Sequence, residues 1–154
     1  MPQPVCAIIG AGEGLGKALA TKFADNGFSL ALISRSQDGS AAAMHAATAI
    51  TPDVKFFQAD AEKPETIEAA LALVAAVMGE IHVLIYNCRE RFTACAPLDI
   101  TYDALTKNFS VEVIGALAAA KSVLPAMIKR SSGSMFFSSA TAAYRGSSTY
   151  PLYS

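Results

Sequence analysis

The feature that most constrains the fold is an apolar run followed by a glycine-rich turn, close to the amino terminus. The run spans residues 5–9 and has the pattern of a strand that is buried on both faces, as in a parallel sheet. The turn carries a glycine at every second position: Gly10, Gly12, Gly14 and Gly16. Apolar residues then recur at helical spacing: Leu15, Ala18, Leu19 and Phe23. A strand, a turn and a helix in this order make the first half of a βαβ unit.

The chemistry of this turn favours a phosphate ligand. Glycine lets a ligand approach the backbone closely. The helix that follows presents unpaired N–H groups and the positive end of its dipole, and together these features form an anion site, typically for a pyrophosphate. The alternative is an ordinary glycine-rich turn, but the strand before it and the helix after it favour nucleotide binding.

The spacing of the glycines distinguishes between nucleotide motifs. A P-loop would need a glycine at position 11 and a hydroxyl residue at position 18, and both positions are alanine. The pattern G-x-G-x-x-G/A fails in both frames, because Leu15 or Lys17 stands at its last place. The pattern G-x-x-x-G-x-G fits, with Gly10, Gly14 and Gly16. This arrangement resembles the short-chain dehydrogenase/reductase family.

Composition narrows the class of protein. The 154 residues suffice for one domain with a real core, since 53% are hydrophobic and only 16% are charged. A net charge of −1 gives no case for nucleic acid or an anionic membrane. The longest nearly apolar run, residues 69–78, falls short of the roughly 20 residues of a membrane helix. Three scattered cysteines and two isolated histidines suggest no metal site, and the cysteines suit a reducing, cytoplasmic setting.

Short apolar runs predict four further strands, at residues 28–33, 54–58, 81–86 and 135–138. Helices are expected at residues 41–50, between Pro64 and Gly79, and at 109–129, and Thr101 is expected to cap a short helix. Pro125 should kink the last helix or begin its final part. One apolar side of that helix consists of Val113, Leu117, Ala120, Leu124 and Met127. Strands that alternate with helices predict an α/β fold, a parallel sheet with helices on both faces.

Several polar segments follow the predicted strands directly. Ligands of such sheets bind at the carboxyl ends of the strands. The segments that meet at this edge are residues 10–16, Ser34 with Arg35, Asp60, Asn87, and Ser138 with Ser139. Their convergence is stronger evidence for a site than any one motif.

The end of the second strand indicates which dinucleotide binds. An NAD site would place an acidic residue there, against the ribose 2′-hydroxyl. This chain has Ser34 and Arg35, so no carboxylate repels a 2′-phosphate, and NADP(H) is favoured over NAD. The alternative is an ordinary solvated arginine. Glu13 weighs against NADP, because NADP-using members of the family often carry a basic residue at that place.

The resemblance implies further cofactor contacts. The turn glycines and Leu15 would lie against the cofactor. Asp60, with its neighbour Ala61, would bind the adenine amino group, although a helix N-cap is an equal alternative for Asp60. The segment Tyr86-Asn87-Cys88-Arg89 aligns with the family's Asn-Asn-Ala-Gly and keeps only Asn87. In the family this segment lines the cofactor site, and Arg89, in place of a glycine, either pairs with a phosphate or obstructs the pocket.

The resemblance also implies catalytic residues. Tyr153 followed by Ser154 resembles the opening of the family's Tyr-x-x-x-Lys motif, which makes Tyr153 the general acid/base. Counting back the usual Ser-to-Tyr spacing gives Ala140, so the catalytic serine is shifted or replaced, with Ser139 or Thr141 as candidates. Ser139 would steady the substrate oxygen. Asn108 matches the residue that holds a relay water, and its alternative is a plain helix-terminal asparagine.

The motif lysine would stand four residues after Tyr153, beyond the 154 residues of the chain. An unassisted tyrosine, with a pKa of about 10, suits proton transfer near neutral pH poorly. We therefore expect one incomplete Rossmann-type domain over residues 1–154, truncated after about the fifth strand and inactive alone. The parent would be a cytoplasmic oxidoreductase that moves a hydride between NADP(H) and a carbonyl or secondary alcohol. The alternative is a catalytically incomplete nucleotide-binding or interaction protein. Exposed apolar surface on the long helix would favour self-association.

Overall fold

β1 (Val5–Ile9) is the central strand of a parallel five-stranded sheet with the order β3-β2-β1-β4-β5. The computed structural model describes residues 3–91 and 93–153. Ile9 pairs with Ile33 on one side and with Tyr86 on the other, so the polar segments after these strands meet at one edge. The predicted Rossmann-type parallel sheet is confirmed. The other strands are β2 (Ser29–Ser34), β3 (Val54–Gln58), β4 (Ile81–Tyr86) and β5 (Ser134–Phe137).

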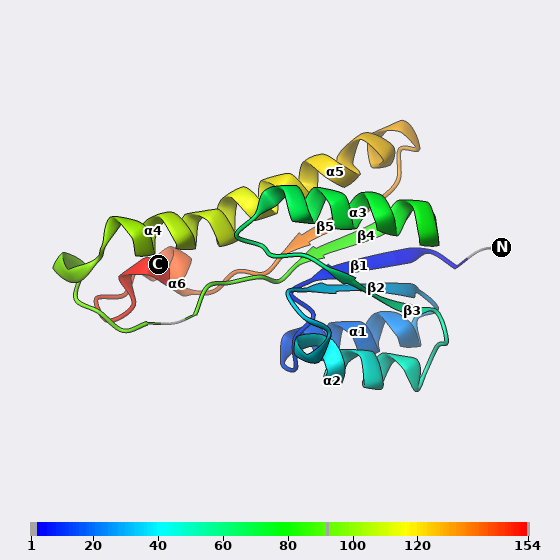
Figure 1. Cartoon of the computed structure of the whole chain (residues 1–154), viewed down its shortest axis with the longest axis horizontal. Coiled ribbons are helices and arrows are strands. Elements are labelled where there is room, and N and C mark those ends of the chain that lie inside the picture. Colours follow the sequence, from blue (N-terminus) through cyan, green and yellow to red (C-terminus); the bar gives the residue numbers. More distant parts are fainter. Residues whose placement is uncertain (1–2, 92, 154) are drawn as a thin grey trace.

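Helices cover both faces of the sheet (Figure 1). α1 (Leu15–Asp25) packs beside α2 (Gln37–Thr48) on one face. α3 (Pro64–Met78) packs beside α5 (Gly115–Lys129) on the other. Each face has its own hydrophobic cluster, because alternate residues of β1 point to opposite faces: Ile8 belongs to the α1–α2 cluster and Ile9 to the α3–α5 cluster.

The long helix begins earlier than predicted. α4 (Tyr102–Phe109), a π-helical turn (Ser110–Ile114) and α5 form one continuous helix, whereas the sequence predicted a start at residue 109. Thr101 caps α4 as expected, because its hydroxyl accepts a hydrogen bond from the Ala104 N–H at 3.2 Å. Pro125 lies inside α5, which continues to its end at Lys129.

The predicted apolar side of this helix is buried only in part, at Met127. Val113 and Leu117 are 47% and 58% exposed. A π-helical turn accommodates one extra residue, so it rotates the face that meets the core. The small residues on the buried side also let α5 approach α3 and the sheet closely. The buried residues of this helix are Val111, Gly115, Ala118, Ala119, Val123 and Met127.

Two other helices differ from expectation. In α1 the buried residues are Gly16, Ala20 and Ala24, whereas Leu15 is 54% exposed. The small residues face the sheet, since a glycine at the first turn brings the helix close to it. α2 begins at Gln37, not near residue 41, because the Ser36 hydroxyl caps it by accepting a hydrogen bond from the Gly39 N–H at 3.2 Å.

The helix Tyr102–Lys129 is long and apolar enough to cross a membrane, with a mean hydropathy of 1.7 in its most apolar window. No long apolar run marks this helix in the sequence, because the charged residues within it divide it into short apolar runs. This is weak evidence for a membrane span, since core helices of soluble proteins pass the same test and α5 packs against α3.

The segments around the long helix and after β5 complete the described chain. A 3₁₀ turn, η1 (Pro97–Asp99), lies in the irregular crossover that precedes α4. After β5 come the short helix α6 (Ala142–Arg145) and a 3₁₀ turn, η3 (Pro151–Tyr153). These last segments lie near α4, at the same end of the molecule (Figure 1).

Candidate functional site

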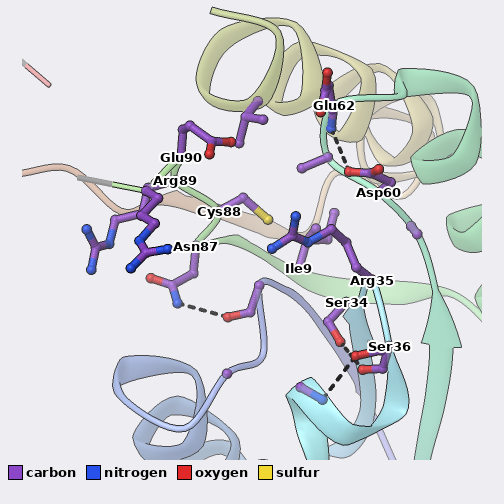
Figure 2. Close-up of a pocket in the computed structure, with 17 residues that line it drawn as sticks. Ile9, Ser34, Arg35, Ser36, Asp60, Glu62, Asn87, Cys88, Arg89 and Glu90 are labelled. Carbon is purple, nitrogen blue, oxygen red and sulfur yellow. Dashed lines mark hydrogen bonds between the residues drawn. The ribbon is translucent and has the colours of Figure 1, made fainter. Parts of the chain in front are cut away.

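Two cavities lie side by side at the carboxyl edge of the sheet. The first, of about 650 Å³, is lined by the segments that follow β1, β2, β3 and β4 (Figure 2). The second, of about 460 Å³, is lined by the glycine turn and by the segment after β5. They share five lining residues and therefore adjoin each other at the glycine turn, and the two together are called the channel: Gly10, Gly12, Asn87, Cys88 and Arg89.

Two glycines of the turn are required by the fold. Gly10 has a φ of 86°, and a Cβ there would lie 2.5 Å from the carbonyl oxygen of Asn87. The Asn87 side chain in turn donates a hydrogen bond to the carbonyl oxygen of Gly10 at 3.1 Å, which fastens the end of β4 to the turn. At Gly16 a Cβ would lie 2.8 Å from the backbone of Ala11, so this glycine allows α1 to pack closely.

The other two glycines face open space. Gly12 and Gly14 have nothing within 4 Å of the position that a Cβ would take. Gly14 is the N-cap residue of α1 and no side chain caps this helix. Backbone N–H groups at the N-terminus of a helix can bind an anion where they face a cavity. Two of the four glycines are thus explained by packing, and two leave room for a ligand.

The segment after β2 forms one wall of the first cavity. The Ser34 hydroxyl is within 2.7 Å of both the Ser36 carbonyl oxygen and the Ser40 hydroxyl. The Arg35 carbonyl oxygen accepts a hydrogen bond from the Gln58 side chain at 2.9 Å. This bond holds the Arg35 backbone, and its guanidinium extends over the cavity toward Cys88 (Figure 2). A guanidinium group that extends over the cavity suits a phosphate group.

Asp60 and Ala61, after β3, line the opposite wall of the first cavity. The Asp60 carboxylate accepts a hydrogen bond from the Glu62 N–H at 3.1 Å (Figure 2). The alternative role of Asp60 as a helix N-cap is wrong, because the N-cap residue of α3 is Lys63. Its carboxylate therefore borders the cavity and is held there by a backbone hydrogen bond.

The Cys88 thiol lies in the channel between the two walls. Burial raises its pKa to about 12, against smaller opposing effects of a hydrogen bond with Tyr86 and of the Arg35 charge. A thiol with this pKa stays protonated at neutral pH and is a poor nucleophile. Cys88 therefore acts as part of the wall, not as a reactive group.

The predicted catalytic residues are only partly brought together. Ser139 and Tyr153 line the second cavity, with Ser138 and Leu15. Ser138 is held by its N–H, which donates to the Tyr86 carbonyl oxygen at 2.9 Å. Asn108 lies elsewhere, in a small pocket that also includes Tyr153. Thr141 is the N-cap residue of α6 and lines neither cavity. Ser154 lies outside the described residues.

One residue of the second cavity was missed by the sequence analysis. Glu112, in the π-helical turn, lines this cavity with Ser139 and Tyr153. Burial raises the pKa of its carboxyl group, although a hydrogen bond from the Glu90 N–H and the nearby Arg89 charge oppose this. A glutamate in a long helix is ordinarily solvated, so only its spacing of four residues from Asn108 could have indicated the site.

A parallel sheet with helices on both faces and a glycine turn at its carboxyl edge is the architecture of Rossmann-type α/β proteins. A family model described as short chain dehydrogenase matches residues 4–154. The chain belongs to the short-chain dehydrogenase family, and the resemblance found in its sequence is confirmed.

Individual relatives agree with this assignment. An uncharacterized oxidoreductase of Staphylococcus aureus is 24% identical over the whole chain, which covers 65% of that protein. A 3-oxoacyl-[acyl-carrier-protein] reductase of Bos taurus is 24% identical over 97% of the chain, which covers 62% of the reductase. The chain therefore spans about two thirds or less of the length of these relatives.

Solved structures show the same fold. A structure of NAD⁺-bound xylitol dehydrogenase has a TM-score of 0.92 at 22% identity, covering 99% of this chain and 58% of that one. A structure of ElxO with NADP bound has a TM-score of 0.88 at 20% identity, covering 98% of this chain and 61% of that one. These neighbours include complexes with both dinucleotides, so the likeness does not distinguish between them.

Proposed function

We propose that this chain binds NADP(H) and is the cofactor-binding portion of an oxidoreductase that acts on a carbonyl or a secondary alcohol. The observation that carries the proposal is the pair of cavities that adjoin at Gly12, of which the first is lined by Arg35 and the second by Ser139 and Tyr153. A dinucleotide has this extended form, with its two phosphates in the middle.

The residues present fit such a cofactor. Arg35 would face the 2′-phosphate, the Asp60 carboxylate would accept a hydrogen bond from the adenine amino group, and backbone at Gly12 and Gly14 would face the pyrophosphate. Asn87 holds the turn in place through Gly10. When bound, the cofactor supplies a hydride-transferring nicotinamide ring, and the protein supplies its orientation.

The residues of the second cavity fit the proton transfer of the proposed reaction. Tyr153 would give a proton to, or take it from, the substrate oxygen, and Ser139 would donate a hydrogen bond to the same oxygen. Asn108 would act through a water in the small pocket that it shares with Tyr153. Because the family's motif lysine would come after the last residue of this chain, we expect these 154 residues alone to bind the cofactor without efficient turnover.

Two further expectations complete the proposal. The three cysteines are free thiols, which fits a reducing compartment such as the cytoplasm. The helix α4–α5 exposes an apolar stripe, and we expect chains to self-associate through it. The stripe consists of Leu105, Phe109, Val113, Leu117, Leu124 and Ile128.

Calorimetric titration of the purified chain with NADPH and with NADH tests the proposal. We expect NADPH to bind more tightly, and Arg35→Ala to remove most of that preference. Arg145→Ala is the matched control, because Arg145 is exposed and lines neither cavity. A folded chain that binds neither dinucleotide would contradict the proposal, and equal binding of both would contradict the role of Arg35.

A further inference from the structure

The second cavity contains a carboxyl group for which the proposed reaction has no use. Glu112 lines it together with Gly14, Ser139 and Tyr153. If the adenosine end of the cofactor lies between Arg35 and Asp60, and its phosphates lie at the glycine turn, the nicotinamide ring enters this second cavity. Glu112 would then border the ring.

The fold holds Glu112 firmly at this place. It belongs to the π-helical turn Ser110–Ile114, a helix distortion that is common at functional sites. The buried Tyr86 hydroxyl donates a hydrogen bond to the Val111 carbonyl oxygen, next to Glu112. A side chain at Gly115 would overlap that hydroxyl, so glycine there permits the contact. The Glu112 carboxylate itself accepts a hydrogen bond from the Glu90 N–H at 3.2 Å.

Three charged residues lie around Glu112: Glu90, Lys107 and Arg89. Lys107 and Glu90 form an ion pair at 3.3 Å, so the Glu90 charge is balanced on the α4 side. Arg89 is close enough to Glu112 to act on its carboxyl group, and it lines both cavities. Arg89 therefore lies where the two cavities adjoin, and Glu112 lines only the second cavity, which the ring would enter.

We infer that Glu112 makes this site prefer the oxidised cofactor, because its carboxylate would border a nicotinamide ring that is positively charged in NADP⁺ and neutral in NADPH. This inference rests on the proposed function. A carboxylate in a partly desolvated cavity interacts with a nearby charge more strongly than it would in water. The phosphates are the same in both forms, so contacts to the phosphates contribute equally to the binding of each. Arg89 also lines the second cavity, and its positive charge would act on the ring in the opposite sense, so the inference requires that Glu112 has the larger effect.

The test compares the dissociation constants of NADP⁺ and NADPH for the complete chain at pH 8, measured by calorimetry. We expect Glu112→Gln to weaken NADP⁺ binding by roughly fivefold to tenfold and to change NADPH binding by less than about twofold. Glu112→Asp, which keeps the charge, should keep most of the preference. Glu68→Gln removes an equal charge from an exposed position on α3 and should change neither constant.

Two results would overturn the inference while leaving the proposed function intact. In the first, Glu112→Gln weakens the binding of NADP⁺ and of NADPH by the same factor, which would mean that Glu112 only supports the shape of the site. In the other, Glu112→Gln changes neither constant although the wild-type chain binds both forms. A wild-type chain that binds neither form would instead overturn the proposed function, and this inference with it.

Discussion

The hydroxyl group of Tyr86, at the end of β4, donates a hydrogen bond to the carbonyl oxygen of Val111 in the π-helical turn. Both residues are buried. This bond joins the central sheet to the long helix beside the second cavity. Burial raises the pKa of the Tyr86 hydroxyl above its ordinary value, so the group remains a proton donor at neutral pH.

Replacing Tyr86 with phenylalanine removes this bond and leaves a buried carbonyl oxygen without its donor. We expect a loss of about 1–3 kcal/mol in the free energy of unfolding, measured with urea. Tyr144→Phe is the control, because Tyr144 is 89% exposed and should tolerate the change. Equal unfolding midpoints for Tyr86→Phe and the wild-type chain would show that the bond does not stabilise the fold.

The four glycines of the turn should separate into two groups. Gly16→Ala should destabilise the chain by about 1–3 kcal/mol, because its Cβ would lie 2.8 Å from the Ala11 backbone. Gly12→Ala meets open space and should leave stability within about 1 kcal/mol of wild type, while weakening NADPH binding by roughly tenfold. Urea unfolding and calorimetry provide the two measurements. A Gly12→Ala variant that unfolds easily, or that binds normally, would contradict this division.

Sequence patterns predicted β1, β3, β4 and α3 to the residue. Continuous apolar runs mark buried strands, and Pro64 and Gly79 mark the two ends of α3. The start of α2 was missed because Gly39, ordinarily a helix breaker, lies in its first turn, where the Ser36 cap stabilises it. Glycine and proline therefore marked the ends of α3 correctly, but Gly39 did not mark the start of α2, because the Ser36 cap stabilises the helix there.

The long helix shows what the sequence could not predict. A regular helical period assigns Leu117 to the core, but the π-helical turn shifts the register and Leu117 is exposed. The same shift of register affects which residue of the helix lines the second cavity. Residues after the strands, such as Arg35 and Asn87, could be placed at the edge from topology alone. Glu112 could not, because its position depends on a helix distortion that no spacing rule predicts.

The thiols of Cys6 and Cys88 should resist alkylation. Burial raises the pKa values of Cys6 and Cys88 to about 12, so at pH 8 only about one part in ten thousand of either is thiolate. Iodoacetamide should label Cys95 before Cys88, because both are partly exposed but burial raises the pKa of the Cys88 thiol. Labelling of Cys6 and Cys88 should increase as pH rises and become rapid in urea. Mass spectrometry of the labelled peptides gives the rates, and native Cys88 labelled as fast as Cys95 would be the contrary result.

The raised pKa of the Glu112 carboxyl group should make the stability of the chain depend on pH. Because burial raises the pKa of its carboxyl group, the folded state binds the proton more tightly than the unfolded state. The free energy of unfolding of wild type should therefore fall, relative to that of Glu112→Gln, as pH rises from the unfolded value of about 4.3 through the raised one. Urea unfolding between pH 4 and pH 8 measures this difference. A difference that is constant, or that reverses in sign, would contradict the buried position of this carboxylate.

The apolar stripe on α4–α5 should cause self-association that depends on concentration. Leu117→Lys places a charge at its centre, where Leu117 is 58% exposed, and should shift the sedimenting species toward monomer. Leu98→Lys makes the same change at a position that is 98% exposed and outside the stripe, and should leave the distribution unchanged. Sedimentation velocity distinguishes the species. Association that is insensitive to Leu117→Lys would assign it to another surface.

The central claim is that the channel at the carboxyl edge of the sheet binds a nicotinamide dinucleotide. Hydrogen–deuterium exchange of the complete chain, with and without saturating NADPH, tests it most directly. We predict slower exchange in the glycine turn and in the segments around Arg35, Asp60 and Asn87, with no change along the exposed side of α5. Exchange that NADPH leaves unaltered in those four segments, or slows only elsewhere, would contradict the account.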